Sequence, residues 1–136
     1  WDELRKIIPL LPPAYFQDGT DWAGSGEFHG IKDGVAQIFV PKGAEPSRFT
    51  VNHEAGHALL ETIGPSALDA YWRARGLPGT PAEWPRGNLP WLLPEEMFAD
   101  DLGAQAEPDG YEAYAQRATK VPYNRAVMDA FYRGIR

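Results

Sequence analysis

Two of the three histidines in this 136-residue chain stand four positions apart, in the segment FTVNHEAGHALL. In an α-helix, residues four apart lie on one face, about 6 Å apart along the axis, so the imidazoles of His53 and His57 can point at one metal ion. The spacing therefore predicts that the motif lies on a helix.

The sequence also predicts where this helix begins and ends. Ser47 and Thr50 are both good N-cap residues, since a side-chain oxygen can accept a hydrogen bond from a free backbone N–H of the first turn. We expect the helix to run to about Ile63, because Gly64 is typical of a helix C-terminus. Gly56, inside the motif, costs up to about 1 kcal/mol of helix propensity relative to alanine. A residue this small would allow another element to approach the helix closely.

Composition limits the kinds of protein that this chain can be. A hydrophobic content of 43% over 136 residues is typical of a globular protein, and we expect residues 1–136 to form a single domain. There is no cysteine, so a metal site must be built from imidazoles and carboxylates. The net charge of −6 argues against nucleic-acid binding through a basic surface. No apolar run is long enough to predict a membrane span.

The sequence leaves the oligomeric state and the compartment open. The short, acidic chain permits a monomer. Its first residue is Trp1 rather than methionine, so we expect a mature product or an excised domain. We favour a secreted, virion-associated or toxin-associated setting over a cytoplasmic one.

Periodicity and turn residues predict an α+β fold, with a small N-terminal sheet or hairpin followed by the motif helix and C-terminal helices. The predicted helices cover residues 1–8, 47–63, 65–75 and 94–106, with one or two more after residue 111. The predicted hairpin turns at Asp33-Gly34 and continues as a strand over residues 35–40, which Pro41 ends. We expect the proline-containing segment at residues 9–20 to be a connection.

A catalytic zinc ion needs a third protein ligand and an open fourth position. Extended motifs with the third ligand six residues after the second histidine require glycine at position 60 and histidine or aspartate at position 63, and Leu60 and Ile63 exclude them. The acidic segment PEEMFADDLGA is the best remaining source. There, Glu96 and Asp100 are four apart, so Glu96 can bind the metal while Asp100 accepts a hydrogen bond from a ligating histidine.

Three alternatives to Glu96 as the third ligand stay open. Glu95 could replace Glu96 as the ligand, although Ala99 gives it no acidic residue four positions later. His29 could supply the ligand if the hairpin folded onto the motif helix. The acidic segment could instead be an ordinary first helical turn, where the helix dipole favours carboxylates, and the histidine pair a chance surface motif.

The glutamate inside the motif indicates the chemistry. Zinc lowers the pKa of a bound water toward neutrality, and a carboxylate beside that water can accept its proton as a general base. Glu54 is next to a ligand in the chain and is placed for this role. We therefore predict that His53, His57 and Glu96 bind Zn²⁺ and that Glu54 is the general base.

Together the two motifs resemble those of the gluzincins, metallopeptidases in which HExxH and a downstream glutamate bind zinc. HEAGH and EEMFADDL are most similar to the compact branch that includes the catalytic domain of anthrax toxin lethal factor and the Pro-Pro endopeptidases. An N-terminal helix ending in LLPP, a hairpin, the motif helix, an insert and the glutamate helix follow in the same order over most of residues 1–102. The resemblance implies a zincin-like fold and a zinc endopeptidase that acts on a peptide or protein substrate.

The resemblance also implies how substrate binds. Zincins lay an extended substrate against an edge strand of their sheet. By this resemblance the strand over residues 35–40 is the edge strand, with Val35, Gln37 and Phe39 on one face.

One expected residue is missing. The related branch usually carries a tyrosine shortly before the glutamate ligand, where it stabilises the oxyanion, but the segment NLPWLLPE has Trp91 and no tyrosine. Tyr123 is our candidate for the oxyanion donor. The alternatives are Tyr71, Tyr111, Tyr114 and His29.

Two other segments carry aromatic and basic residues. The proline-rich segment 77–94 is expected to be a loop, and its Trp84 and Trp91 either wall the cleft or cover the core as a lid. Arg73 and Arg75, in the segment RAR, are expected to be solvated at a helix end.

Two further functions stay open. The chain could be a catalytically degenerate zincin-fold binding module, an alternative motivated by the missing tyrosine. It could also be a structural zinc protein, which would need a fourth protein ligand.

Overall fold

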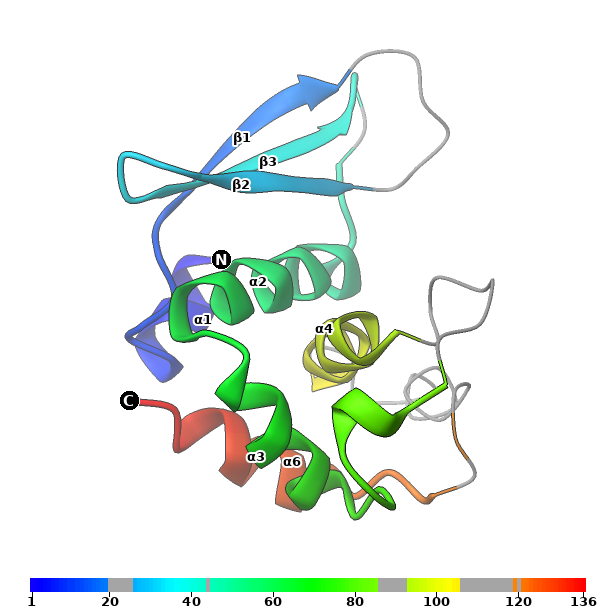
Figure 1. The fold of residues 1–136 in the computed structure, drawn as a ribbon. Coiled ribbons are helices and arrows are strands. Elements are labelled where there is room, and N and C mark those ends of the chain that lie inside the picture. The colour runs from blue at the N-terminus through cyan, green and yellow to red at the C-terminus, as the bar shows by residue number, and fades with distance from the viewer. Residues whose placement is uncertain (20–25, 44, 86–92, 106–118, 120) are drawn as a thin grey trace.

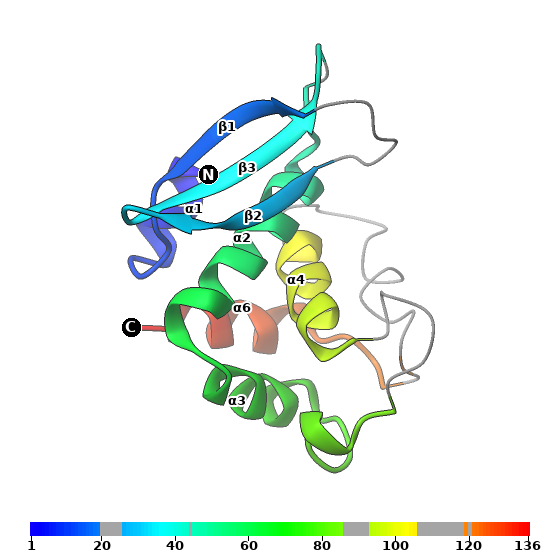
Figure 2. The same cartoon turned by 45° about the horizontal axis from the view of Figure 1, so that its top comes forward.

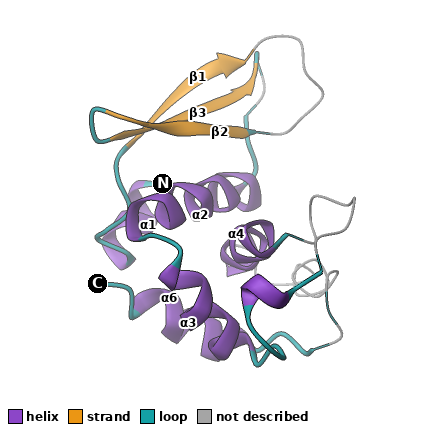
Figure 3. Cartoon of the chain, in the orientation of Figure 1, coloured by secondary structure: helices purple, strands orange, loops and turns teal. Residues whose placement is uncertain are grey.

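The computed structural model describes residues 1–19, 26–43, 45–85, 93–105, 119 and 121–136 (Figure 1). Within these ranges a small sheet forms in the N-terminal part of the chain, and most of the helical structure follows it (Figure 3). The α+β class predicted from the sequence is confirmed.

The sheet consists of β1 (Ala14–Gly19), β2 (Glu27–Lys32) and β3 (Val35–Pro41), in the order β1-β3-β2. β2 and β3 form the predicted antiparallel hairpin, and both turn residues have positive φ, 52° at Asp33 and 76° at Gly34. Aspartate and glycine tolerate this conformation, which a two-residue hairpin turn requires. β1 pairs with β3 in parallel.

The parallel strand was not expected. The prediction that residues 9–20 are a connection is wrong for residues 14–19, which form β1. Because β1 pairs with one side of β3 and β2 with the other, β3 is the central strand. The prediction that residues 35–40 form an edge strand is therefore also wrong.

This correction changes the expected peptide-binding surface. Val35, Gln37 and Phe39 do share one face of β3, opposite the face on which Ala36 and Ile38 are buried. However, both edges of β3 are occupied by neighbouring strands, so its backbone cannot pair with an added peptide. The edges of this sheet belong to β1 and β2.

The helices are α1 (Asp2–Ile7), α2 (Arg48–Ile63), α3 (Ser66–Arg75), α4 (Pro94–Gln105) and α6 (Arg125–Arg133), with a 3₁₀ turn at Pro81–Glu83. α2 lies below the sheet with α4 beside it, and α3 and α6 lie on the side of α2 away from the sheet (Figure 1, Figure 2). None of the described helices is long and apolar enough to cross a membrane.

The motif helix α2 has the predicted bounds. Ser47 is its cap, because the backbone N–H of Thr50 donates to Ser47 Oγ at 3.1 Å. Ile63 is its last residue, and Gly64 follows with a φ of 87°. Local signals therefore define this helix before any tertiary contact is considered.

α2 and α4 cross at two glycines, one on each helix. A Cβ at Gly56 would lie 2.7 Å from the Cα of Ala99, and a Cβ at Gly103 would lie 2.8 Å from the ring of Phe49. At Gly56 the neighbour is backbone, so this position requires glycine, whereas a side chain at position 103 would force the Phe49 ring to move. The close approach expected at Gly56 is confirmed, and it brings the motif face of α2 next to α4.

A buried ion pair joins α3 to α4. Arg75 Nε donates to Asp101 Oδ2 at 2.7 Å, and the Tyr71 hydroxyl donates to the same oxygen. The side chains of Arg75 and Asp101 are 1% and 0% exposed. A second nitrogen of Arg75 lies 3.4 Å from the carbonyl oxygens of Val121 and Pro122, so the pair also fixes the segment before α6.

This pair corrects the expectation for the RAR segment. Arg73 is exposed as predicted, but Arg75 points into the core. Burial raises the pKa of Asp101 to about 7, although Arg75 and Tyr71 oppose the shift.

Candidate metal centre

The three predicted ligands converge where α2 and α4 meet. The Nε2 atoms of His53 and His57 lie 3.3 Å apart. The carboxylate oxygens of Glu96 lie 3.2 Å from the first nitrogen and 3.1 Å from the second. Among the described residues, these three form the one group of potential ligands whose donor atoms all lie within 4.8 Å of one another.

These separations fit a tetrahedral zinc ion. Ligand atoms about 2.0–2.1 Å from such an ion lie about 3.3–3.4 Å from one another. The two Nε2 atoms have this spacing. Two imidazoles and one carboxylate also match the donor set of a catalytic zinc site, which keeps one position for water or substrate. The residues present therefore fit the ion that the sequence predicts.

Asp100 orients one of the ligands. Its Oδ1 lies 2.9 Å from Nδ1 of His53, the ring nitrogen on the side away from Glu96. The Asp100 side chain is only 4% exposed, so water competes little for this contact. A proton held on Nδ1 leaves Nε2 free to coordinate a metal. The spacing of Glu96 and Asp100 thus places one carboxylate at each ring nitrogen of His53.

Neighbouring charged groups shift the pKa values of the ligands. Burial favours the neutral form of His53, but its contacts with Asp100 and Glu96 outweigh burial and raise the pKa of the ring to about 10. Burial likewise opposes ionisation of Glu96, yet the two histidines hold its pKa well below the usual range. The cluster therefore stabilises an anionic Glu96 beside a positive partner.

Glu54 lies between the ligand cluster and the sheet. It is buried, and its charge interacts with those of His53, His57 and Glu96. Burial raises the pKa of Glu54, and the charges of His53 and His57, with a smaller contribution from the backbone N–H of Phe28, offset this shift only in part. A raised pKa suits a carboxylate that accepts a proton near neutral pH.

β2 packs directly onto this glutamate. A Cβ at Gly26 would lie 2.7 Å from Cγ2 of Thr50 and 3.6 Å from Cγ of Glu54. The glycine just before β2 therefore lets the chain approach α2 at the position of the predicted base. The role of Gly26 could not be predicted from the sequence, because a glycine before a strand does not indicate which helix it will contact.

Tyr123 lies in the core. Its hydroxyl donates to the backbone carbonyl of Asp101 at 3.2 Å and accepts a hydrogen bond from the Gln105 amide. Asp101 and Gln105 are four apart and mark a different face of α4 from the one that carries Glu96. The contacts of Tyr123 thus lie away from the ligands, so they do not support its predicted role as the oxyanion donor.

Other described tyrosines do not replace it. The Tyr71 hydroxyl donates to Asp101, the Tyr132 hydroxyl donates to the carbonyl of Phe98, and Tyr15 is exposed on β1. Tyr111 and Tyr114 lie outside the described residues. The described part of the chain therefore assigns no tyrosine to the oxyanion.

The alternative ligands are not in the cluster. His29 lies on β2, where its Nε2 is 3.0 Å from Glu27 and its ring packs against Phe39 with centroids 4.4 Å apart. Glu95 is on α4 but is not part of the convergent group in the described structure. The preference for Glu96 over Glu95 is thus consistent with the geometry.

The structure describes one of the two tryptophans in the predicted loop. Trp84 packs against Trp72 with ring centroids 5.3 Å apart and helps to cover the core, as expected of a lid. Trp91 lies outside the described residues.

Comparisons with family models, with curated proteins and with solved structures find no match for this chain. The relationship to the gluzincins therefore remains a prediction from the two motifs.

Proposed function

We propose that this protein is a zinc-dependent endopeptidase of the gluzincin type, with a zincin-like fold. The observation that carries the proposal is the convergence of His53, His57 and Glu96 with Glu54 beside them. Zinc held by these residues supplies a Lewis acid, which polarises a carbonyl and lowers the pKa of water.

Glu54 moves the proton in this mechanism. It accepts a proton from the attacking water and passes it to the nitrogen of the leaving amine. The N–H of Phe28 keeps the carboxylate in place, and burial raises its pKa toward the working range. Asp100 acts through His53, by holding that ring in the tautomer and orientation that coordination needs.

We assign peptide binding to β2 instead of β3. β2 is at the end of the strand order, contacts α2 and reaches Glu54 through Phe28. An extended peptide that adds to this edge would pass close to the base. The edge of β1 lies on the other side of β3 and has no such contact with Glu54 among the described residues.

The test is a Glu54→Gln variant. We expect it to keep zinc but to lose peptide hydrolysis by about 100- to 10,000-fold, because the base is removed and the three ligands are not. Hydrolysis would be measured on a mixed peptide library with and without chelator, and zinc by elemental analysis. Glu61→Gln, at an exposed position on the same helix, is the matched control and should cleave normally. Cleavage by Glu54→Gln at the wild-type rate would rule out the mechanism.

A second candidate is a zinc-dependent peptide-binding module without turnover. The observation that favours it is that the hydroxyls of Tyr71, Tyr123 and Tyr132 donate to Asp101 or to the carbonyl of Phe98 and not to the ligand cluster. If the wild-type protein binds zinc and captures peptides but no chelator-sensitive cleavage is detected, the binding module is the better account.

A further inference from the structure

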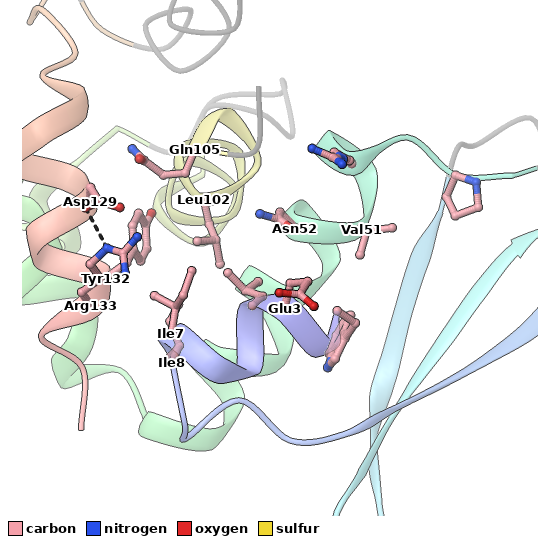
Figure 4. A pocket seen from close by; sticks show the side chains of 14 residues that line it. Glu3, Ile7, Ile8, Val51, Asn52, Leu102, Gln105, Asp129, Tyr132 and Arg133 are labelled. Carbon is pink, nitrogen blue, oxygen red and sulfur yellow. Dashed lines mark hydrogen bonds and ion pairs between the residues drawn. The ribbon is translucent and has the colours of Figure 1, made fainter. Parts of the chain in front are cut away.

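A cavity lies on the side of the α2–α4 pair opposite the metal ligands. Its volume is about 500 Å³, and its walls come from α1, α2, α4 and α6. Figure 4 shows Asn52 of α2 and Leu102 and Gln105 of α4 around this hollow, with Ile7 of α1 facing them. A cavity of this size is in the range that binds small molecules.

Helix geometry separates the cavity from the metal centre. On α4, Leu102 and Gln105 occupy a different face from Glu96. On α2, Asn52 is next to His53 in sequence and therefore points about 100° away from it. The cavity is thus separate from the ligand cluster, with which it shares no lining residue.

The floor of the cavity is apolar and rigid. Ile8, Leu102 and Tyr132 are 0%, 1% and 2% exposed, so they belong to the packed core. Ile8 directly follows α1, Leu102 lies on α4 and Tyr132 lies on α6. An apolar ligand body would therefore contact a preformed surface and would not need a loop to order around it.

The charged side chains around the cavity include two ion pairs and one further arginine. Glu3 is paired with Lys6 at 2.8 Å, and Asp129 is paired with Arg133 at 2.8 Å, the contact drawn as a dashed line in Figure 4. Arg48 also lines the cavity, and no carboxylate within the described ranges pairs with it. The amide of Asn52, one helical turn further along the same face, makes no hydrogen bond within those ranges either.

We propose that this cavity binds a small amphipathic carboxylate, with its apolar chain on the floor formed by Ile8, Leu102 and Tyr132 and its carboxylate on Arg48 and Asn52. A guanidinium and an amide N–H₂ together provide the donors that a carboxylate accepts. Glu3 and Asp129 are each paired with a cation, so they repel such an anion less than unpaired carboxylates would. This site does not depend on the proposed peptidase activity.

The experiment uses decanoate as the probe and measures its affinity by isothermal titration calorimetry, with the full chain both zinc-loaded and chelator-treated. We expect saturable binding to one site in both forms. Decanol, which has the same chain without the charge, should bind about tenfold more weakly.

Two variants locate the site. Arg48→Gln should weaken decanoate about tenfold and leave decanol unchanged, because only the charged contact is lost. Val51→Phe fills the cavity from the α2 side and should weaken both probes. Arg73→Gln, an exposed arginine outside the cavity, is the control for net charge and should behave as wild type. Circular dichroism would verify that each variant is folded.

Three results would overturn the proposal. They are the absence of saturable decanoate binding, equal affinities for decanoate and decanol, and decanoate binding that neither Arg48→Gln nor Val51→Phe changes. None of these results bears on zinc binding or peptide hydrolysis, so the two proposals fail separately.

Discussion

Helix α4 carries carboxylates on two faces, and the two faces hold them in different ways. On the first, Glu96 is 27% exposed and contacts two histidines. On the second, Asp101 is fully buried against Arg75. An imidazole can exchange its proton for a metal ion, whereas a guanidinium remains charged under all ordinary conditions. Both groups are carboxylates. The difference between a candidate metal ligand and a structural ion pair therefore comes from the partner side chain and from the exposure to solvent.

The two faces also depend on each other. Asp100 holds His53 on the first face, and the adjacent Asp101 is held by Arg75 on the second. The buried pair therefore fixes the rotation of α4 about its axis, which in turn sets where Glu96 meets α2. The following predictions separate the roles of the two faces.

The largest effect is expected at the first face. Glu96→Gln should abolish stoichiometric zinc binding at neutral pH, because it leaves only two ligands for an ion that needs three. Its free energy of unfolding should change little, since Glu96 is partly exposed. Zinc would be measured by calorimetry, and Glu95→Gln is the neighbouring control. Loss of zinc in Glu95→Gln but not in Glu96→Gln would reverse the ligand assignment.

The next largest effect is expected at the second face. Arg75→Met should lower the free energy of unfolding by about 3–5 kcal/mol, because Asp101 is left buried without its cation. Urea denaturation would measure the loss. Arg73→Met, two residues earlier and exposed, should be close to neutral. Under conditions where Arg75→Met is folded it should still bind zinc, and a variant that is fully stable would show that the pair does not hold α4.

A smaller effect is expected where the faces meet. Asp100→Asn should weaken zinc binding by about 10- to 100-fold, because His53 loses the acceptor that orients its ring. The ligands themselves are retained, so binding should remain measurable by competition with a chelating dye. An unchanged affinity would mean that packing alone positions His53.

The effect of a single pH unit is expected to be the smallest. The pKa of His53 is raised to about 10, so at neutral pH this ring carries a proton that zinc must displace. Zinc affinity should therefore rise with pH, by about tenfold per unit below that pKa, and one proton should be released on binding. Calorimetry in buffers of different ionisation enthalpy would count the proton. If no proton were released at pH 7, His53 would have to be neutral before zinc binds.

The elements that could be predicted from sequence are those with local signals. Ser47 and Gly64 bound the motif helix, and Asp33 and Gly34 form the hairpin turn. The spacing of Glu96 and Asp100 fixes their common face on α4, so their meeting with His53 needed only that the two helices pack together.

The features that were missed depend on contacts between distant segments. β1 follows two prolines and gains its strand structure from parallel pairing with β3, which no local pattern reveals. The burial of Arg75 depends on Asp101, 26 residues later in the chain. The position of Tyr123 likewise depends on the face of α4 that it meets, so its role could not be read from the segment around it.

The most direct test of the account is a crystal structure of the zinc-loaded protein, with anomalous diffraction data collected at the zinc edge. We expect one peak about 2.0–2.2 Å from Nε2 of His53, Nε2 of His57 and a carboxylate oxygen of Glu96, with the fourth position open to solvent. A zinc ion bound elsewhere, or one enclosed by four protein ligands, would contradict the account.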